Sequence, residues 1–313
     1  MKINKDDLDW AVEQEIISIS QADSLWSGFE ERTADRTGFG FVQVLYYFGA
    51  LIVIGAMTLF LGTAWESLGG GGIFVVALIF AGLFVWGGLN FANRPGLKIP
   101  SGLLITMAVC VTPLAVYGFQ RWLNIWGFDD PGEYQSFFKW VKGGWFTMEI
   151  ATIATGLIAL KYFRFPFLSA PIAFVLWYIS MDLTPIIFGD EFTWQNRQLV
   201  SAWFGIAMIA TSYYIDIKFK PDFAFWGYLF GMSAFWIALL TMNSGSEINK
   251  FLYFLINIGC MGISVFLRRR IFIVYGALGT LGYMGHLASK IFADSVLFPI
   301  ILILFGLGVL YCG

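Results

Sequence analysis

The chain has 313 residues, of which 58% are hydrophobic and 13% are charged, and its formal net charge is −2. Soluble domains carry about 25% charged residues, so this composition excludes an ordinary soluble domain and predicts a membrane protein. The small net charge also provides no overall basic field, and we therefore expect no nucleic-acid partner.

Residues 1–38 are charged and helix-patterned, and they predict a small cytoplasmic headpiece of two helices. Ser20 is the predicted N-cap of the second helix, with Asp23 as its capping-box partner. The isoleucines of IISIS (16–20) are expected to lie in the turn and to close a minimal core. Four apolar residues recur at helical spacing in the second helix: Ala22, Leu25, Trp26 and Phe29.

The headpiece is acidic: within residues 1–36, four basic residues face nine acidic ones, a net charge of −5. Anionic lipid would repel such a surface. The loops predicted on the same side of the membrane hold nine basic residues and two acidic ones. Two interpretations remain open. The headpiece docks through Glu30, Glu31 and Asp35 on a basic face of its own membrane domain or of a partner, or it is a solvated pair of helices.

Residues 39–313 form the predicted transmembrane domain. Apolar segments near the ~20 residues that a bilayer requires predict an all-α, polytopic bundle of about ten helices. The expected spans are 43–64, 73–92, 100–119, 146–160, 165–181, 199–215, 221–241, 251–267, 271–289 and 296–313. The GGGG run at 69–72 is predicted to be a tight turn between the first two spans, because no lysine follows it to complete a phosphate-binding loop.

Lysine and arginine predict the orientation of the bundle. With a cytoplasmic N-terminus, 13 of the 19 basic residues fall on the cytoplasmic side and 6 on the outer side. Positive charge concentrates on the cytoplasmic side of membrane proteins, so the N-terminus is expected to be cytoplasmic.

One stretch of the chain, about residues 7–68, resembles a known family. The matching residues are Ile19, Ser20, Gln21 and Ala22 in the headpiece, and Gly49, Ala50, Leu51, Gly55 and Trp65 in the first span. They resemble the bacterial family of predicted membrane proteins known only as domain of unknown function twenty-one fifty-seven. The chain departs from the family pattern at Ala64, where asparagine is usual, and lacks the usual glycine before the turn isoleucine. The resemblance implies a multi-pass protein of the bacterial inner (cytoplasmic) membrane with a cytoplasmic N-terminal unit, and it implies no activity.

Signatures of catalysis are missing from the sequence. The single histidine excludes a site with two histidine ligands, and neither GxSxG nor GxxxxGK[ST] occurs. Paired carboxylates or metal ligands at the centre of the membrane are also missing. We therefore expect no enzyme, no cofactor and no metal site.

Five polar residues lie within or beside the apolar spans, where a charge is costly and therefore suggests function. Counting along each helix places all five in the outer half: Glu149, Asp182, Asn257, His286 and Lys290. One interpretation is an outward-facing pocket in which Glu149 or Asp182 pairs with Lys290, and His286 titrates near neutral pH. The other is that these residues lie at the headgroup boundary, where lysine extends to the surface.

The outer loop 120–145 holds four tryptophans and is predicted to be an aromatic anchor at the membrane surface, or a lid or partner surface. Two functions are compatible with these features. The first is a non-catalytic subunit or sensor that docks a protein partner through the headpiece or this loop. The alternative is a transporter or binding protein for a small solute or lipid.

Overall fold

A computed structural model describes residues 5–34, 41–94, 97–125, 146–188, 193–219, 221–242 and 245–291, together with Ile300 and Ile303. Within these ranges the chain is helical, with short turns and no strand, which confirms the predicted all-α class there. Contacts divide the chain into two compact units, residues 1–59 and 60–313. The two units are described separately below.

The first unit contains α1 (Lys5–Glu13) and α2 (Ile19–Ala34), which pack on each other. The cap of α2 lies at Ser18. Its backbone N–H donates to Oε1 of Gln21 at 2.9 Å, and the Gln21 N–H donates to Oγ of Ser18 at 3.3 Å. This is a capping box two residues before the predicted one. The prediction of Ser20 and Asp23 is wrong because Ser20 already lies within the helix.

The isoleucines at the turn do not form a core. Ile16 is 64% exposed and Ile19 is 70% exposed, whereas Leu8 and Ala22 are buried at 9% and 7% exposure. Two helices of this length enclose only one narrow contact, so Ile16 and Ile19 point outward, whereas Ile17 is half-buried. The predicted isoleucine core is therefore wrong for Ile16 and Ile19, which the first unit presents on its surface.

The second unit is a set of apolar helices. Among the described residues, six are long and apolar enough to cross a membrane, which indicates a membrane protein. These six are Leu68–Ala92, Lys98–Leu123, Pro166–Thr184, Trp194–Lys218, Glu247–Leu267 and Arg270–Lys290. The predicted span 296–313 lies outside the described residues except for Ile300 and Ile303.

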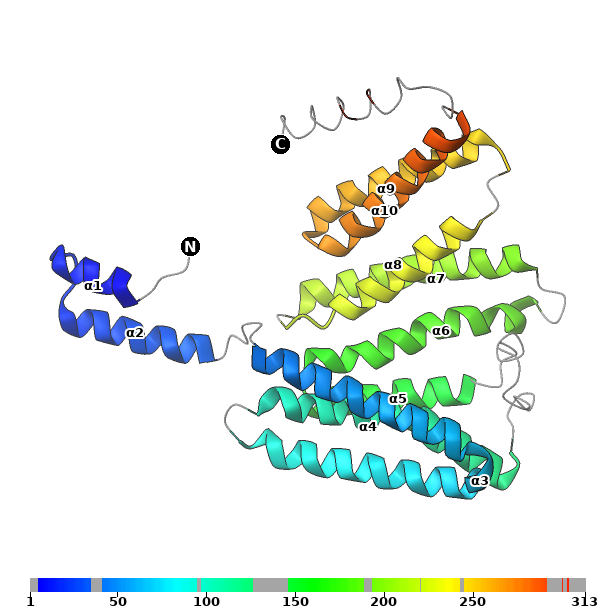
Figure 1. Ribbon diagram of the computed structural model, residues 1–313, viewed down its shortest axis with the longest axis horizontal. Helices are drawn as coiled ribbons and strands as arrows, with labels where there is room; N and C mark the ends of the chain where they lie inside the picture. The colour runs from blue at the N-terminus through cyan, green and yellow to red at the C-terminus, as the bar shows by residue number, and fades with distance from the viewer. Residues whose placement is uncertain are drawn as a thin grey trace. The chain divides into compact units, whose positions relative to one another are not determined.

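The helices follow one another as antiparallel neighbours (Figure 1). Their bounds are α3 (Phe41–Ala92), α4 (Lys98–Leu123), α5 (Phe146–Tyr162), a 3-10 turn (Pro166–Leu168), α6 (Ser169–Phe188), α7 (Trp194–Lys218), α8 (Phe225–Thr241), α9 (Glu247–Leu267) and α10 (Arg270–His286), which continues as a π turn (Leu287–Ile291). Consequently α5, α7 and α9 begin at the end of the bundle where α4, α6 and α10 finish. We call this the site end.

Gly69 interrupts α3 with φ 60° and ψ 174°, a backbone conformation that glycine adopts readily. The predicted break is present there, but Gly70–Gly72 are helical rather than part of a turn. Gly70 instead allows close packing, because a Cβ at this position would lie 2.5 Å from the Trp122 backbone nitrogen. Gly118 is equally close to Phe74, so α4 and the second half of α3 approach backbone to backbone.

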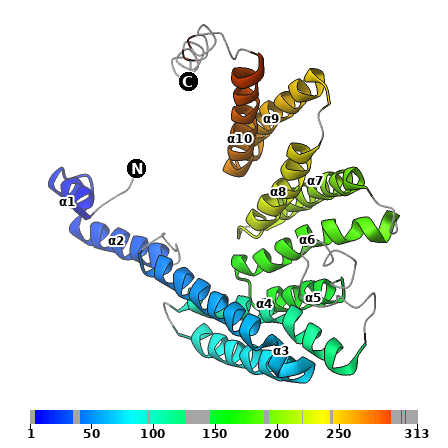
Figure 2. The ribbon, with the colours of Figure 1, turned by 45° about the vertical axis from the view of Figure 1, so that its right-hand side comes forward.

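The pairs α7–α8 and α9–α10 lie side by side in both views (Figure 1, Figure 2). Small residues make this possible. A Cβ at Gly205 of α7 would lie 2.6 Å from the Gly231 carbonyl oxygen of α8. In the second pair, Gly276 and Gly279 of α10 lie directly against Asn257 of α9. Such contacts are typical of helices that pack within membranes.

Arg269 fastens four segments together at the end of the bundle opposite the site end. Its Nε and Nη2 donate to the Asp216 carboxylate at 3.1 and 2.5 Å, and its Nη1 donates to Asp222 at 2.7 Å. The guanidinium also lies 5.5 Å from the centre of the Tyr228 ring. The hydrogen bonds to Asp216 and then Asp222 raise the pKa of Arg269 above its usual range. The turn before α10 is thereby tied to α7, to the loop after α7 and to α8.

Candidate functional site

The structure separates the five predicted polar residues into different environments. Glu149 and Asp182 come together between α5 and α6, and His286 joins a charged group at the beginning of α9. Asn257 lies in the packing of α8, α9 and α10. Lys290 is exposed in the π turn. The residues therefore do not share one pocket, although Glu149, Asp182 and His286 all lie near the site end.

Glu149 and Asp182, which we call the acid pair, are the most deeply buried carboxyl groups in the described residues. Glu149 is 5% exposed and Asp182 is 0% exposed. The two carboxyl groups are close enough to interact, but none of their four oxygen atoms has a hydrogen-bond partner in the described part of the chain. The structure thus pairs each acid with the other and not with Lys290.

Two neighbours complete the surroundings of the acid pair. Tyr178 lies one helical turn before Asp182 on α6, and it interacts electrostatically with both acids. The positive charge of Arg197, on α7, acts on Asp182 and on Tyr178. Its guanidinium also lies 5.8 Å from the centre of the Trp194 ring. Three consecutive helices therefore contribute charged or polar groups to one buried cluster.

Arg197 was missed from the sequence because the predicted span began at residue 199. The helix begins five residues earlier, at Trp194, where Oγ1 of Thr193 accepts the Asn196 N–H at 3.3 Å. A threonine before a run of helix-compatible residues is an N-cap signal. Recognising that signal would have placed Arg197 in the first turn of α7, next to the end of α6.

Asn257 connects three helices through its side chain. Its Oδ1 accepts a hydrogen bond from Nε1 of Trp236 at 3.0 Å, and its Nδ2 donates to the Tyr253 carbonyl at 2.7 Å. On the other side, its amide lies directly against Gly279. These contacts give Asn257 a packing role, and its role in binding a ligand stays a prediction.

His286 belongs to a charged group with Glu247 and Lys250. Its Nε2 lies 3.0 Å from the Glu247 carboxylate and 3.3 Å from Nζ of Lys250, and Lys250 contacts Glu247 at 2.6 Å. A single ring nitrogen either donates to Glu247 or accepts from Lys250. The group can therefore exchange partners around His286 without moving a helix.

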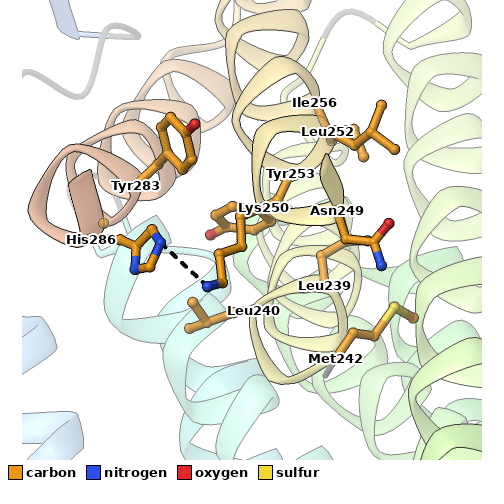
Figure 3. Close-up of a pocket in the computed structure, with 11 residues that line it drawn as sticks. Leu239, Leu240, Met242, Asn249, Lys250, Leu252, Tyr253, Ile256, Tyr283 and His286 are labelled. Atoms are coloured by element: carbon orange, nitrogen blue, oxygen red, sulfur yellow. Dashed lines mark hydrogen bonds between the residues drawn. The ribbon is translucent and has the colours of Figure 1, made fainter. Parts of the chain in front are cut away.

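A pocket opens beside this charged group, with a volume of about 450 Å³ (Figure 3). Most of its wall is apolar, and we call it the α8–α10 pocket. The lining residues are Leu239, Leu240, Met242, Asn249, Lys250, Leu252, Tyr253, Ile256, Gly282, Tyr283 and His286. The buried Tyr253 hydroxyl lies near the Asn257 side chain but forms no hydrogen bond within the described ranges. An apolar wall with a few converging polar groups is the usual form of a small-molecule site.

Several predicted contacts cannot be placed. Glu30 and Glu31 lie on α2, but the structure does not describe their side chains. Asp35 lies outside the described residues. Of the predicted outer loop 120–145, residues 126–145 are likewise outside it, and its first residues belong to the last turn of α4. Gln120 in that turn bonds to Thr147 of α5 at 2.9 Å. The docking role of the loop remains a prediction.

Metal binding finds no support in the described ranges, where no group of three or more histidine, cysteine, aspartate or glutamate side chains could hold an ion. Comparison with known proteins adds no relative, since no family model, curated protein or solved structure matches the chain. The α8–α10 pocket and the acid pair are therefore interpreted from their own chemistry.

Proposed function

We propose that the protein is a non-enzymatic membrane protein that binds a lipid or a small lipid-like solute in the α8–α10 pocket. The observation that carries this proposal is the combination of an apolar wall with a charged group at one side of it. An amphipathic molecule presents the same two surfaces. Its hydrocarbon would lie on Leu240, Leu252 and Ile256, and its polar end would meet Lys250 and His286.

The charged group favours a polar end that carries an acidic oxygen. Lys250 contacts only Glu247 and His286 among the hydrogen bonds and ion pairs of the described residues, and Glu247 is largely exposed. Solvent screens an exposed ion pair strongly, so a phosphate or carboxylate of a ligand can replace Glu247 at small cost.

The first test is to fill the pocket. Gly282 lines it, and a Cβ added there would meet no atom within 4 Å, so the backbone accepts a side chain at this position and the ring of Gly282→Phe is expected to occupy the cavity. Binding of a fluorescent fatty-acid or phospholipid analogue to the purified protein should weaken by about tenfold. Gly285→Phe is the matched control, because a Cβ at Gly285 also meets no atom within 4 Å but Gly285 does not line the pocket. Equal binding by the two variants would reject the pocket as the site.

A second candidate function is that of a subunit or sensor which docks a partner through the headpiece. The exposed apolar residues of the first unit favour it, since Ile16 and Leu25 line a groove and Ile19 is 70% exposed. Exposed apolar patches on small domains commonly mark partner surfaces. The acidic charge of residues 1–36 would select a basic partner surface, in the same protein or in another.

Ile16→Ser with Ile19→Ser tests the apolar part of this docking surface. Both side chains are already exposed, so the helix content measured by circular dichroism should not change. Recovery of a partner in a gentle-detergent pull-down should fall to background, whereas Gln14→Ser, a change at another exposed position, should leave it intact. Reversing the charges of Glu30, Glu31 and Asp35 should in addition speed proteolysis of the headpiece. Unchanged recovery and unchanged proteolysis would contradict docking.

The remaining features of the proposal concern the class of protein. We propose about ten membrane crossings with a cytoplasmic N-terminus in a bacterial inner membrane. The excess of lysine and arginine on one set of loops favours this orientation. Membership of the family named above is proposed on the same residues, 7–68, and brings no activity with it.

A further inference from the structure

The acid pair is buried outside the α8–α10 pocket, and ligand binding in that pocket does not account for two acids in contact. Glu149 and Asp182 are each more than nine-tenths buried, and their four oxygen atoms lack hydrogen-bond donors within the described ranges. A single buried carboxylate without a donor is already strongly unfavourable. Two ionised carboxylates in contact would add their mutual repulsion in a medium of low dielectric constant.

The charged neighbours of the pair define how much negative charge it can hold. Tyr178 of α6 and Arg197 of α7 are the groups whose charges act on it in the described part of the chain. Tyrosine is uncharged near neutral pH, and arginine always carries one positive charge. Two carboxylates would place two negative charges beside the one positive charge of Arg197, whereas one carboxylate and one carboxylic acid place a single negative charge there.

A metal cation would fit this cluster less well than a proton. The described residues offer two acids and no third acid, histidine or cysteine that could complete a metal site. The guanidinium of Arg197 would also repel a second cation. A proton needs neither extra ligands nor space, and it converts one carboxyl group into a hydrogen-bond donor to the other.

We propose that Glu149 and Asp182 share one proton, and that Arg197 balances the single negative charge that remains. The proton comes from water and returns to water, with no other group transferred. Glu149 lies three residues after the first residue of α5, about 4.5 Å along the helix axis, so the exchange would take place through the site end. The protein would thus carry a one-proton site that is separate from the α8–α10 pocket.

Infrared spectroscopy of the full-length protein in lipid tests this proposal directly. At neutral pH the wild type should show the absorption of one protonated carboxylic acid. This absorption should be absent from the spectrum of Glu149→Gln. With one acid removed, the other can ionise beside Arg197, so the number of protonated carboxyl groups falls from one to zero. Asp182→Asn should give the same loss and serves if Glu149→Gln does not fold. Glu13→Gln changes an exposed carboxylate outside both sites and should leave the absorption intact.

Two results would overturn the proposal. Persistence of the absorption in both pair variants would place the proton elsewhere. Loss of the wild-type absorption when sodium replaces choline at constant pH would show that the pair binds a metal cation. The fluorescent-ligand assay with Gly282→Phe is independent of this measurement, so failure of the proton site and failure of the pocket can be told apart.

Discussion

Arg269→Ala is expected to lower the free energy of unfolding by about 2–3 kcal/mol, between the values for exposed and buried ion pairs. The Arg269 side chain is 19% exposed, and its guanidinium holds Asp216 and Asp222 in place. Its removal leaves two neighbouring carboxylates without their donor and detaches the turn before α10 from α7 and α8. Thermal unfolding of the detergent-solubilised protein measures the loss as a lower midpoint temperature.

Arg270→Ala provides the matched control, because Arg270 is exposed and forms none of these hydrogen bonds. Its midpoint should stay close to that of the wild type. Arg269→Lys keeps the charge but loses the two-pronged hydrogen bond to Asp216, so it should recover only part of the stability. Equal midpoints for Arg269→Ala and Arg270→Ala would show that this network does not hold the helices together.

Gly279→Ala is expected to lower the free energy of unfolding by about 1–3 kcal/mol, as is usual when an extra carbon enters a packed interior. A Cβ at this position would overlap the Asn257 side chain, which is itself fixed by Trp236. The α9–α10 pair must then separate, or Asn257 must give up its hydrogen bond. The loss should again appear in the thermal midpoint.

Gly285→Ala lies on the same helix with no atom near the new Cβ, and alanine favours helix, so this control should be neutral or slightly stabilising. The double variant of Gly279→Ala with Asn257→Ala tests whether overlap with the Asn257 side chain causes the loss of stability. If the overlap is the reason, the double variant should lose less stability than the sum of the single variants. Strict additivity would contradict the proposed contact between Gly279 and Asn257.

The apolar patterning of the sequence anticipated helices in the second unit, because long apolar runs leave few alternatives in a membrane. The predictions are wrong where the first residue of a helix depends on one polar capping residue. Ser20 matched a capping pattern, but Ser18 with Gln21 satisfies the same pattern two residues earlier. The predicted span 199–215 likewise begins five residues after the first residue of α7, so it leaves out Arg197.

The acid pair can be predicted from the sequence, whereas the hydrogen bonds of Arg269 cannot. Counting along consecutive antiparallel spans already placed Glu149 and Asp182 near the same membrane face, so their meeting follows from the short connection between α5 and α6. The partners of Arg269 lie 47 and 53 residues away, on segments that only the packed bundle brings together.

Ligand binding in the α8–α10 pocket is the central claim, and photocrosslinking in native membranes tests it most directly. A phospholipid analogue with a photoreactive group in its acyl chain would be activated in the presence of the full-length protein, and the labelled peptides identified by mass spectrometry. We expect labelling to concentrate on residues 249–256 and 282–286, and to decrease in Gly282→Phe but not in Gly285→Phe. Labelling spread evenly over the lipid-facing helices, and unchanged in Gly282→Phe, would contradict the claim.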